Sequence, residues 1–424
     1  MIDRVHLNPL PISATFSKDP SFWGVDFHPR AIVHGDGARV LGDDGHIYLD
    51  WVSALGANLL GYANREFVLR MQRQMALGAG FSLPHTLEAQ VAEKLAYMLG
   101  EHVPGWSPEN VGIRFGKTGT DATTMAVRLA RAATGRQRIL SSGYHGWGDW
   151  SVSKTPPAWG IESAFQVTDG LVFNDIPILE ALLDGTLTIM GRPPNLEIAA
   201  VIIEQPMTDP DPGYYAALRR LCDQEGALLI MDEVVTWPRY GLGGACEHFD
   251  IEPDIVCLGK GLGNGVAISC IAGRRELFDW FGRDDPVFVS STHFGEALGL
   301  AAADAVLDLF GEEQVTQLWR IGTALMLGLR QSFGYPIDAG INVIGHPPRS
   351  LNQFASKAER AYFILGMRDR RILMNRPNLP NLAHTEDNVA LTVAAATEVM
   401  AEMRLIDVEE TMRGRLPRVL FENR

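Results

Sequence analysis

The chain has 424 residues, of which 46% are hydrophobic and 21% are charged. This balance is typical of a folded globular protein and excludes a disordered chain, a collagen-like repeat and a coiled coil. The 51 acidic residues outnumber the 37 basic ones, so the net charge is −14. Such a surface repels polyanions and anionic membranes, and the sequence indicates no nucleic acid partner. No uncharged apolar run reaches about 18 residues, so we expect no membrane-spanning helix.

The four cysteines, Cys222, Cys246, Cys257 and Cys270, show no Cys-x-x-Cys spacing. They favour neither a disulfide framework nor a zinc site, so we expect reduced thiols and no bound metal. Residues 1–16 interrupt their apolar positions with charged residues and prolines, and therefore lack the hydrophobic stretch of a secretion signal. Together these features predict a cytoplasmic protein.

The two ends of the chain are expected to build a small domain. Residues 37–51 form two short strand-like runs around an Asp-Gly pair, which is a typical hairpin signal. After residue 305 the composition becomes helical, and residues 394–403 predict a terminal helix. We therefore expect residues 1–65 to contribute to a small α+β domain, residues 66–305 to form a large domain, and residues 306–424 to complete the small one.

The large domain is predicted to have an α/β fold with a mostly parallel sheet. Short apolar runs alternate there with helix-like stretches, which is the pattern of strands buried on both faces. The runs are Val111–Phe115, Arg138–Ser141, Ala199–Ile203, Ala227–Met231, Asp254–Leu258 and Ser269–Ala272. Residues 120–134 predict a helix that Gly135 ends. Because ligands of such sheets bind at the carboxyl ends of the strands, we expect the chemistry just after each run.

A single lysine lies among glycines directly after one of these strands. Residues 259–265 read Gly-Lys-Gly-Leu-Gly-Asn-Gly, which leaves the amine of Lys260 accessible at the end of a rigid strand. A partly desolvated lysine amine forms Schiff bases with carbonyl groups. The alternative is a glycine-rich loop with a solvated lysine. A dinucleotide site is not indicated, because no start in this stretch gives Gly-x-Gly-x-x-Gly.

Two acids, Asp232 and Glu233, follow another buried strand. One carboxylate at that position could hold a protonated ring nitrogen or a metal, and the alternative is a helix cap or a surface pair. A third strand leads through residues 115–122 into the predicted helix, whose free N–H groups and threonine hydroxyl form an anion site. The glycine spacing departs from a P-loop, so we expect phosphate binding without nucleotide hydrolysis. The alternative is a simple N-cap at Thr120.

Residues 142–147 present an aromatic ring and an imidazole on a glycine-bounded loop. These groups suit stacking on a planar ring, although such loops also serve packing alone. The four features come in the order anion site, aromatic platform, acid and lysine, each after a strand of one sheet. Together they match the phosphate, ring face, ring nitrogen and aldehyde of pyridoxal phosphate.

Over nearly its whole length the chain resembles the class III aminotransferases of the fold type I pyridoxal-phosphate enzymes, in particular the glutamate-1-semialdehyde aminomutase branch. The resemblance implies a large domain with a mostly parallel, seven-stranded sheet. The matching motifs are Thr118-Gly-Thr-Asp-Ala122, Tyr144-His-Gly146, Asp232-Glu-Val234 with Arg239 and Gly243-Gly-Ala245, Leu258-Gly-Lys260 and Thr292-His-Phe-Gly295. Lys117 stands where the family usually has Asn, a change expected to add charge near the phosphate.

The resemblance also implies roles for individual residues. Lys260 would be the catalytic Schiff-base lysine, and Asp232 would keep the pyridine nitrogen protonated. Glu204 matches a family glutamate on the substrate side and is our third catalytic candidate. The remaining cofactor-binding candidates are Gly119, Thr120, Tyr144, His145, Val234 and, from the neighbouring subunit, Thr292. The ring would lie between Tyr144 and Val234.

We therefore predict an aminotransferase or aminomutase that moves an amino group between a small amino donor and a small carbonyl acceptor. The alternative on the same scaffold is a pyridoxal-phosphate-dependent decarboxylase, lyase or epimerase, since the bond that breaks depends on which substituent stands perpendicular to the ring. A cofactor-binding protein without catalysis is disfavoured by the intact Lys260 and Asp232. The position of Thr292 implies a homodimer with shared active sites.

Overall fold

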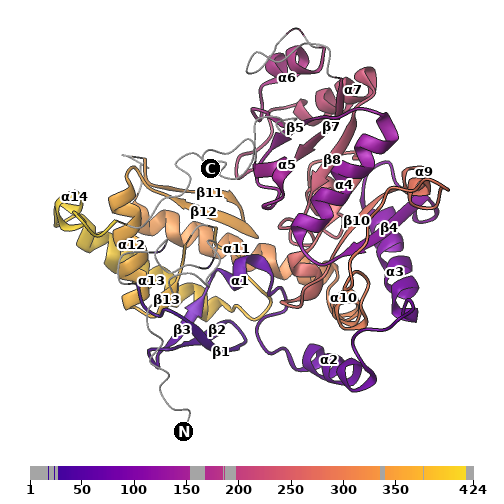
Figure 1. Ribbon diagram of the computed structural model, residues 1–424. Helices are drawn as coiled ribbons and strands as arrows, with labels where there is room; N and C mark the ends of the chain where they lie inside the picture. Colours follow the sequence, from indigo (N-terminus) through magenta and orange to yellow (C-terminus); the bar gives the residue numbers. More distant parts are fainter. Residues whose placement is uncertain are drawn as a thin grey trace.

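The computed structural model describes residues 27–152, 168–184, 197–334, 340–375 and 377–416, together with residues 18, 23 and 186. The described elements form two regions that lie side by side (Figure 1). One is built around a seven-stranded sheet, and the other combines strands from both ends of the chain with three long helices. No helix of the described residues is long and apolar enough to cross a bilayer.

The seven-stranded sheet has the order β4-β10-β9-β8-β7-β5-β6. Its strands are β4 (Val111–Gly116), β5 (Arg138–Ser142), β6 (Thr168–Gly170), β7 (Ile198–Ile203), β8 (Leu228–Asp232), β9 (Ile255–Leu258) and β10 (Ser269–Arg274). Only β10 runs antiparallel to its neighbours, so the sheet is mostly parallel. The predicted α/β class is confirmed, and the six strands expected from apolar runs all belong to this sheet.

Helices cover both faces of this sheet. Ala200 and Ile202 of β7 belong to the same core cluster as Ala126 and Ala130 on α4 (Gly119–Thr134). The alternate β7 residues Val201 and Ile203 pack in the cluster that contains α7 (Tyr214–Glu225). All six residues of β7 are consequently buried, which explains its unbroken apolar run.

The helix predicted over residues 120–134 is present as α4, which starts one residue earlier at the carboxyl end of β4. Its N-cap is Thr118 instead of Thr120: the Thr118 hydroxyl accepts a hydrogen bond from the Asp121 N–H at 3.2 Å, and the Asp121 carboxylate accepts one from the Thr118 N–H at 2.8 Å. This reciprocal capping box moves the helix start back to Gly119. Gly135 ends the helix in a left-handed conformation with φ 71°, as predicted.

The second region joins segments from the two ends of the chain. Strands β1 (Ile32–Asp36), β2 (Arg39–Gly42) and β3 (Ile47–Asp50) are antiparallel neighbours, and β13 (Ile372–Leu373) lies parallel to β3. The predicted hairpin is therefore present as β2 and β3, with β1 added at its edge. A second hairpin is formed by β11 (Asn342–His346) and β12 (Arg349–Gln353). The proposed domain boundaries at residues 65 and 305 stay a prediction.

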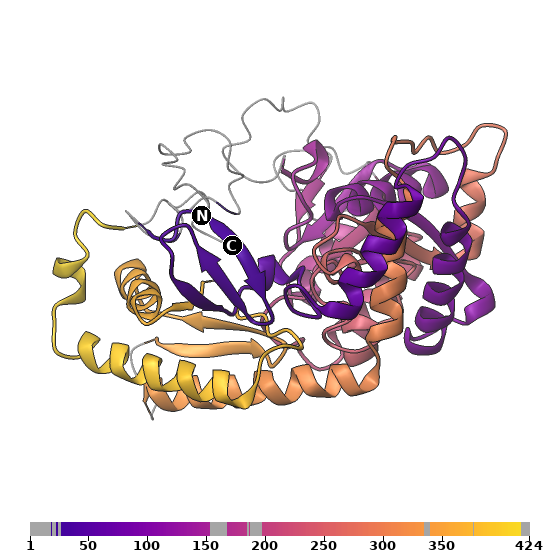
Figure 2. The same cartoon turned by 90° about the horizontal axis from the view of Figure 1, so that it is seen from below.

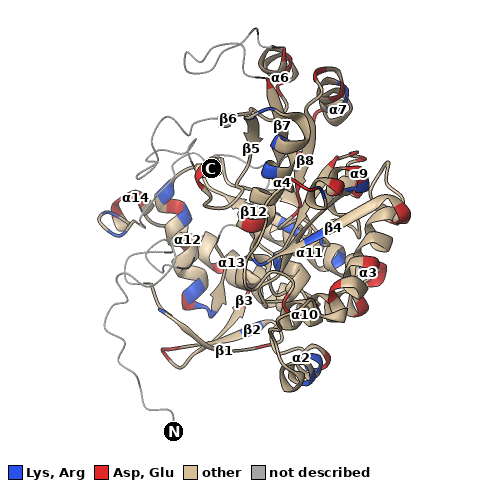
Figure 3. Ribbon diagram, turned by 45° about the vertical axis from the view of Figure 1, so that its right-hand side comes forward, with Lys and Arg blue, Asp and Glu red and all other residues tan. Residues whose placement is uncertain are grey.

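Two long helices, α11 (Glu312–Phe333) and α13 (Glu386–Met403), run side by side under these strands (Figure 2). Leu325 and Leu329 of α11 share a buried cluster with Val399 of α13. The terminal helix expected over residues 394–403 is the second half of α13. Arg370, after α12 (Lys357–Asp369), pairs with Glu398 and Glu402 on α13. Helix α12 itself carries basic and acidic residues (Figure 3).

The other helices surround the large sheet or connect the two regions. They are α1 (Ser53–Gly56), α2 (Arg65–Leu77), α3 (Thr86–His102), α5 (Asp149–Val152), α6 (Ile176–Leu183), α8 (Gly244–His248), α9 (Arg275–Phe278) and α10 (Ala297–Leu309), with short 3₁₀ turns at Pro108–Asn110, Lys260–Gly263 and Asp279–Phe281. Helix α14 (Val408–Thr411) lies beside α12 in the second region (Figure 1).

A fully buried arginine after β8 ties both ends of the chain to the large sheet. The Nη1 of Arg239 donates to the carbonyl of Pro380 at 2.6 Å, and its Nη2 donates to the carbonyl of Gly56 at 2.9 Å. Burial lowers the pKa of this guanidinium to about 10, with a smaller contribution from the nearby Arg349. Arg239 thus holds the two regions together beside the carboxyl ends of the central strands.

Candidate active site

Lys260 follows β9 at the edge where the parallel strands end. Its backbone has φ 42°, in the left-handed region that non-glycine residues seldom adopt. Strain of this kind, about 1–3 kcal/mol, persists only where surrounding contacts impose it, and it gathers at functional sites. One such contact is the Oδ1 of Asn264, at the end of the same loop, which accepts a hydrogen bond from the Leu60 N–H at 2.8 Å. The lysine side chain is thereby presented from a fixed loop.

The surroundings of Lys260 favour its neutral amine. Burial is the largest effect and lowers the pKa of Lys260. The carboxylates of Glu204 and Asp232 raise this pKa and partly offset the burial, whereas the guanidinium groups of Arg349 and Arg239 lower it further. A lysine with a lowered pKa provides more of the unprotonated amine that attacks carbonyl groups and accepts protons.

Asp232 is the last residue of β8, and its buried carboxylate is held on both oxygens. Its Oδ2 lies 2.7 Å from Nδ1 of His145, and its Oδ1 accepts a hydrogen bond from the Val234 N–H at 3.1 Å. The other ring nitrogen of His145 lies 3.0 Å from the carbonyl of Ser142. Both nitrogens of the imidazole therefore face oxygen acceptors, and the ring fixes the direction of the carboxylate.

Glu233 points the other way and caps a helix. Its two oxygens accept hydrogen bonds from the N–H groups of Ala245 and Cys246 at 2.9 and 2.8 Å, at the start of α8, and it also bonds the hydroxyl of Thr236. Burial raises the pKa of Glu233. Of the two acids predicted after this strand, Glu233 is thus the helix cap and Asp232 lies beside the lysine.

The turn into α4 offers an anion site. The capping box uses the N–H groups of Thr118 and Asp121, and within the described part of the chain no hydrogen bond occupies the N–H groups of Gly119 and Thr120. A Cβ on Gly119 would lie 2.9 Å from Cγ1 of Val234, so only glycine lets these two segments approach. Free N–H groups at the start of a helix suit a phosphate.

The loop that carries Tyr144 and His145 packs against the same turn. The Thr123 hydroxyl donates to the carbonyl of His145 at 2.8 Å, and the Trp147 N–H lies 3.4 Å from the Thr120 hydroxyl oxygen. The Tyr144 N–H donates to Oε2 of Glu204 at 3.1 Å, and 43% of the tyrosine remains exposed. The tyrosine ring is thus accessible on a loop fixed at three points.

Lys117 does not add a net charge to this turn. Its Nζ donates to the carbonyl of Ala267 at 2.6 Å and forms an ion pair with Glu296. The expected extra charge is compensated, because Glu296 at the start of α10 supplies the opposite one.

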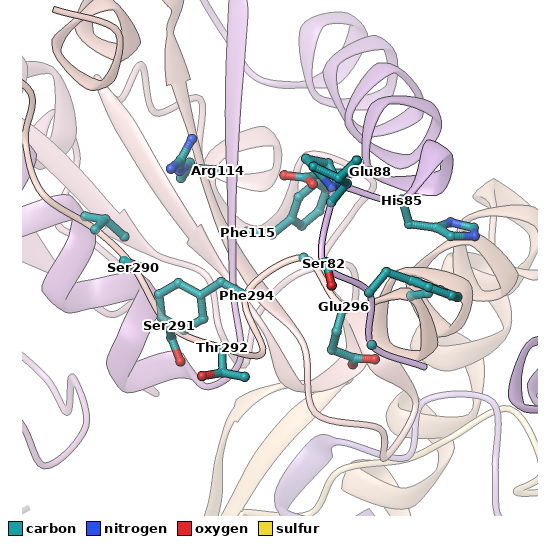
Figure 4. A pocket seen from close by; sticks show the side chains of 17 residues that line it. Ser82, His85, Glu88, Arg114, Phe115, Ser290, Ser291, Thr292, Phe294 and Glu296 are labelled. Atoms are coloured by element: carbon teal, nitrogen blue, oxygen red, sulfur yellow. The ribbon is translucent and has the colours of Figure 1, made fainter. Parts of the chain in front are cut away.

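Thr292 lies apart from the other candidates. It is exposed on the wall of a cavity of about 490 Å³ between residues 80–88 and 289–297 (Figure 4). None of the other predicted site residues is among the described residues that line this cavity. Among the described residues, contacts join Tyr144 to Glu204, His145 to Asp232 and Gly119 to Val234, whereas Thr292 lines a cavity that none of these residues lines.

Arg349 is a charged residue of the candidate site that the sequence analysis did not identify. Arg349 begins β12 and donates through Nη2 to Oε1 of Glu204 at 2.8 Å, from 145 positions away in the sequence. Burial opposes ionisation of Glu204, but the cations Arg349 and Lys260 hold its pKa below the usual value. No motif identified in the sequence includes Arg349.

These residues fit pyridoxal phosphate by their chemistry and by their places in the fold. Lys260, Asp232 and the Tyr144 loop follow neighbouring or nearby strands of one sheet, and the free N–H groups of Gly119 and Thr120 follow β4. The buried hydroxyl of Ser269, next to the backbone of Gly116, also has no hydrogen-bond partner in the described part of the chain. A lysine, a directed acid, an accessible aromatic ring and unused donors are the groups that this cofactor requires.

Comparison with known proteins gives the same result. The sequence profile described as Aminotransferase class-III matches residues 23–333. Glutamate-1-semialdehyde 2,1-aminomutase from Thermomicrobium roseum is 32% identical over 419 residues, covering 90% of this chain and 93% of that protein. The FumI protein of a Sphingopyxis species, solved in a PLP form, is 25% identical with TM-score 0.80 and 94% of each chain covered. An omega-transaminase from Sphaerobacter thermophilus shares the fold, with 23% identity, TM-score 0.81 and coverage of 93% and 95%. The chain therefore belongs to the class III aminotransferases, the fold type I family of pyridoxal-phosphate-dependent enzymes.

Proposed function

We propose that Lys260 carries the pyridoxal phosphate of an aminotransferase or aminomutase that moves an amino group to or from a small carbonyl compound. The observation that carries this proposal is the convergence of Asp232 and Glu204 on a partly buried lysine whose pKa is lowered. When bound, the cofactor supplies an aldehyde that condenses with amines and a ring that accepts carbanion electrons.

Each residue of the candidate site has a defined role in this proposal. The Lys260 amine holds the cofactor and moves a proton at the substrate carbon, which its lowered pKa favours. Asp232, held by His145, places a negative charge where a protonated ring nitrogen would lie. The ring would lie between Tyr144 and Val234, and the N–H groups of Gly119 and Thr120 would bind the phosphate. Glu204 faces Lys260 from the end of β7, on the substrate side.

We further propose a homodimer in which Thr292 of the partner subunit completes the phosphate site. Thr292 is exposed and lies outside the cluster around Lys260 in its own chain. Large apolar side chains near its cavity are also exposed, including Leu83 at 79% and Phe288 at 72%. Monomeric proteins seldom leave such side chains uncovered in one patch, so a second copy of the chain is the expected cover.

A cytoplasmic location is part of the same proposal. All four cysteines are free and buried. Free thiols are typical of a reducing compartment, where disulfides are rare. Fractionation of cells with an antibody against the protein tests this assignment, and recovery outside the cytoplasm would contradict it.

The function is tested on protein loaded with pyridoxal phosphate. Borohydride reduction followed by peptide mapping should fix the cofactor to Lys260, and the Lys260→Ala variant should take no label. In a separate sample that has not been reduced, a panel of small amino donors should convert the cofactor to its amino form, as seen by absorbance. A label on Lys117 would overturn the site. Release of carbon dioxide or racemisation without the amino form would identify the alternative reactions instead.

A further inference from the structure

We infer that Arg349 is a positioning residue of the active site, which holds the carboxylate of Glu204 and, through it, the backbone of Tyr144. This inference rests on the function proposed above. Glu204 accepts from Arg349 on one oxygen, at 2.8 Å, and from the Tyr144 N–H on the other, at 3.1 Å. The carboxylate is therefore a bridge between the β11–β12 hairpin and the loop expected to stack on the cofactor ring.

The bridge has a rigid base on the side of the central sheet. The second terminal nitrogen of Arg349, Nη1, donates to the carbonyl of Gln205 at 2.8 Å. Gln205 is fully buried, bonds the hydroxyl of Tyr215 and donates to the carbonyl of Thr208 at 3.0 Å. A planar guanidinium that bonds two consecutive residues of a fixed loop leaves the Glu204 side chain little freedom.

The hairpin that carries Arg349 is equally well fixed. The Nε and Nη2 of Arg330 on α11 donate to the carbonyl of Val343 on β11, at 3.0 and 2.7 Å. The turn between β11 and β12 lies against the same helix, since a Cβ on Gly322 would be 1.9 Å from the carbonyl oxygen of Pro347. Arg349 thus reaches the site from a base that α11 holds in place.

The same contact controls the charge near Lys260. Lys260 faces the carboxylates of Glu204 and Asp232 and the cations Arg349 and Arg239, and Glu204 also faces His145. Removing Arg349 takes away one cation and releases Glu204 from its partner while it is still buried. Both changes favour a protonated nitrogen at Lys260, so deprotonation should require a higher pH.

The test uses the cofactor-loaded protein and two readouts that do not depend on turnover. These are the pH midpoint of the absorbance change of the lysine-bound cofactor, and the dissociation constant of pyridoxal phosphate from equilibrium dialysis. Arg349→Gln should raise the midpoint by roughly one pH unit and weaken cofactor binding several-fold. Glu204→Gln should lower the midpoint. In the Glu204→Gln background, Arg349→Gln should shift the midpoint much less, because the group it positions is gone.

Two further variants separate positioning from folding. Arg330→Gln removes a bond that fixes the same hairpin without touching Glu204. Because Pro347 still packs on α11, this variant should lower the melting temperature and shift the midpoint far less than Arg349→Gln does. Arg349→Lys keeps the charge but not the paired geometry, so it should restore the midpoint and only part of the cofactor affinity. If Arg349→Gln is insoluble, the cofactor affinity of Arg349→Lys still tests the paired geometry.

Equal midpoint shifts from Arg349→Gln in both backgrounds would overturn the inference, as would an Arg330→Gln shift of the same size. A wild-type protein that binds no cofactor at Lys260 would instead refute the proposed function, so the two failures are distinguishable.

Discussion

The loop after β9 and the hairpin β11–β12 both bring a basic side chain to the active site, but they do so in different ways. Lys260 is placed by its neighbours in the sequence, namely a buried strand before it and glycines around it. Arg349 is placed by a contact that spans 145 positions and depends on how the hairpin lies on the loop after β7. The first residue supplies a reactive group, and the second adjusts the charge and position of others.

This difference separates two kinds of function in one site. Residues at the ends of the central strands carry the chemistry, because parallel strands place their carboxyl ends together. The second region adds the charge of Arg349, and hydrogen bonds of Arg239 and Arg349 connect this region to the large sheet. Variants in the two regions should therefore differ in kind: the first should stop the reaction, and the second should shift its pH dependence or the stability of the fold.

The largest effect is expected at the end of β8. Asp232→Asn should retain the cofactor but lose about 3 kcal/mol of transition-state stabilisation, roughly a 150-fold fall in turnover, since a neutral amide cannot balance a protonated ring nitrogen. Steady-state kinetics measures the loss of turnover, and the absorbance of the bound cofactor measures its retention. Glu233→Gln is the matched control, because this neighbouring acid only caps α8, and it should reduce stability while turnover stays near normal. Near-normal turnover in Asp232→Asn would place the ring nitrogen elsewhere.

A somewhat smaller effect is expected at Thr292. A variant of this residue tests whether one chain contains a complete active site. Thr292→Val should weaken phosphate binding by about 1.5–3 kcal/mol, the usual loss for a hydrogen bond to a charged group. Mixing this variant with Lys260→Ala protein, under conditions that exchange subunits, should restore one complete site in each mixed dimer. Activity in the mixture is compared with each variant alone. Full activity in a species that sediments as a monomer would contradict the shared site.

The last expected effect concerns stability and leaves turnover at neutral pH unchanged; it lies in the second region, at His384. Its ring stacks on Trp51 at 3.9 Å, and burial lowers its pKa from 6.5 to about 3. The neutral ring therefore stabilises the fold fully above pH 6.5, and this contribution is lost as the pH falls toward 3, by up to roughly 1.4 kcal/mol per pH unit. Urea unfolding at a series of pH values should show this slope, and His384→Gln should reduce it. An unchanged slope in that variant would assign the acid sensitivity to other groups.

Much of the fold was predictable because the responsible interactions are local. The runs around β7, β8 and β9 are continuously apolar since helices cover both faces of the sheet, and Gly135 ends α4 because only a left-handed residue suits that position. The helix over residues 120–134 was predicted to within one residue, and the alternative of an N-cap at Thr120 was wrong. Thr118 and Thr120 are both good capping residues, and only the reciprocal bond with Asp121 selects Thr118.

The residues of the candidate site also fall into those that the sequence predicted and those that it did not. The sequence alone determined which residues follow the strands: Lys260, Asp232, the Tyr144 loop and the turn at Gly119 were identified from motifs, since each motif lies within a few residues of one strand end. Only the tertiary structure decided that Asp232 turns to His145 while Glu233 caps α8, and that Arg349 pairs with Glu204. Asp232 and Glu233 follow the same strand, so their local sequence does not distinguish their roles. The pair of Arg349 with Glu204 joins distant segments, so no short sequence motif indicates it. Their directions are set by the packing of whole elements, which no short stretch of sequence contains.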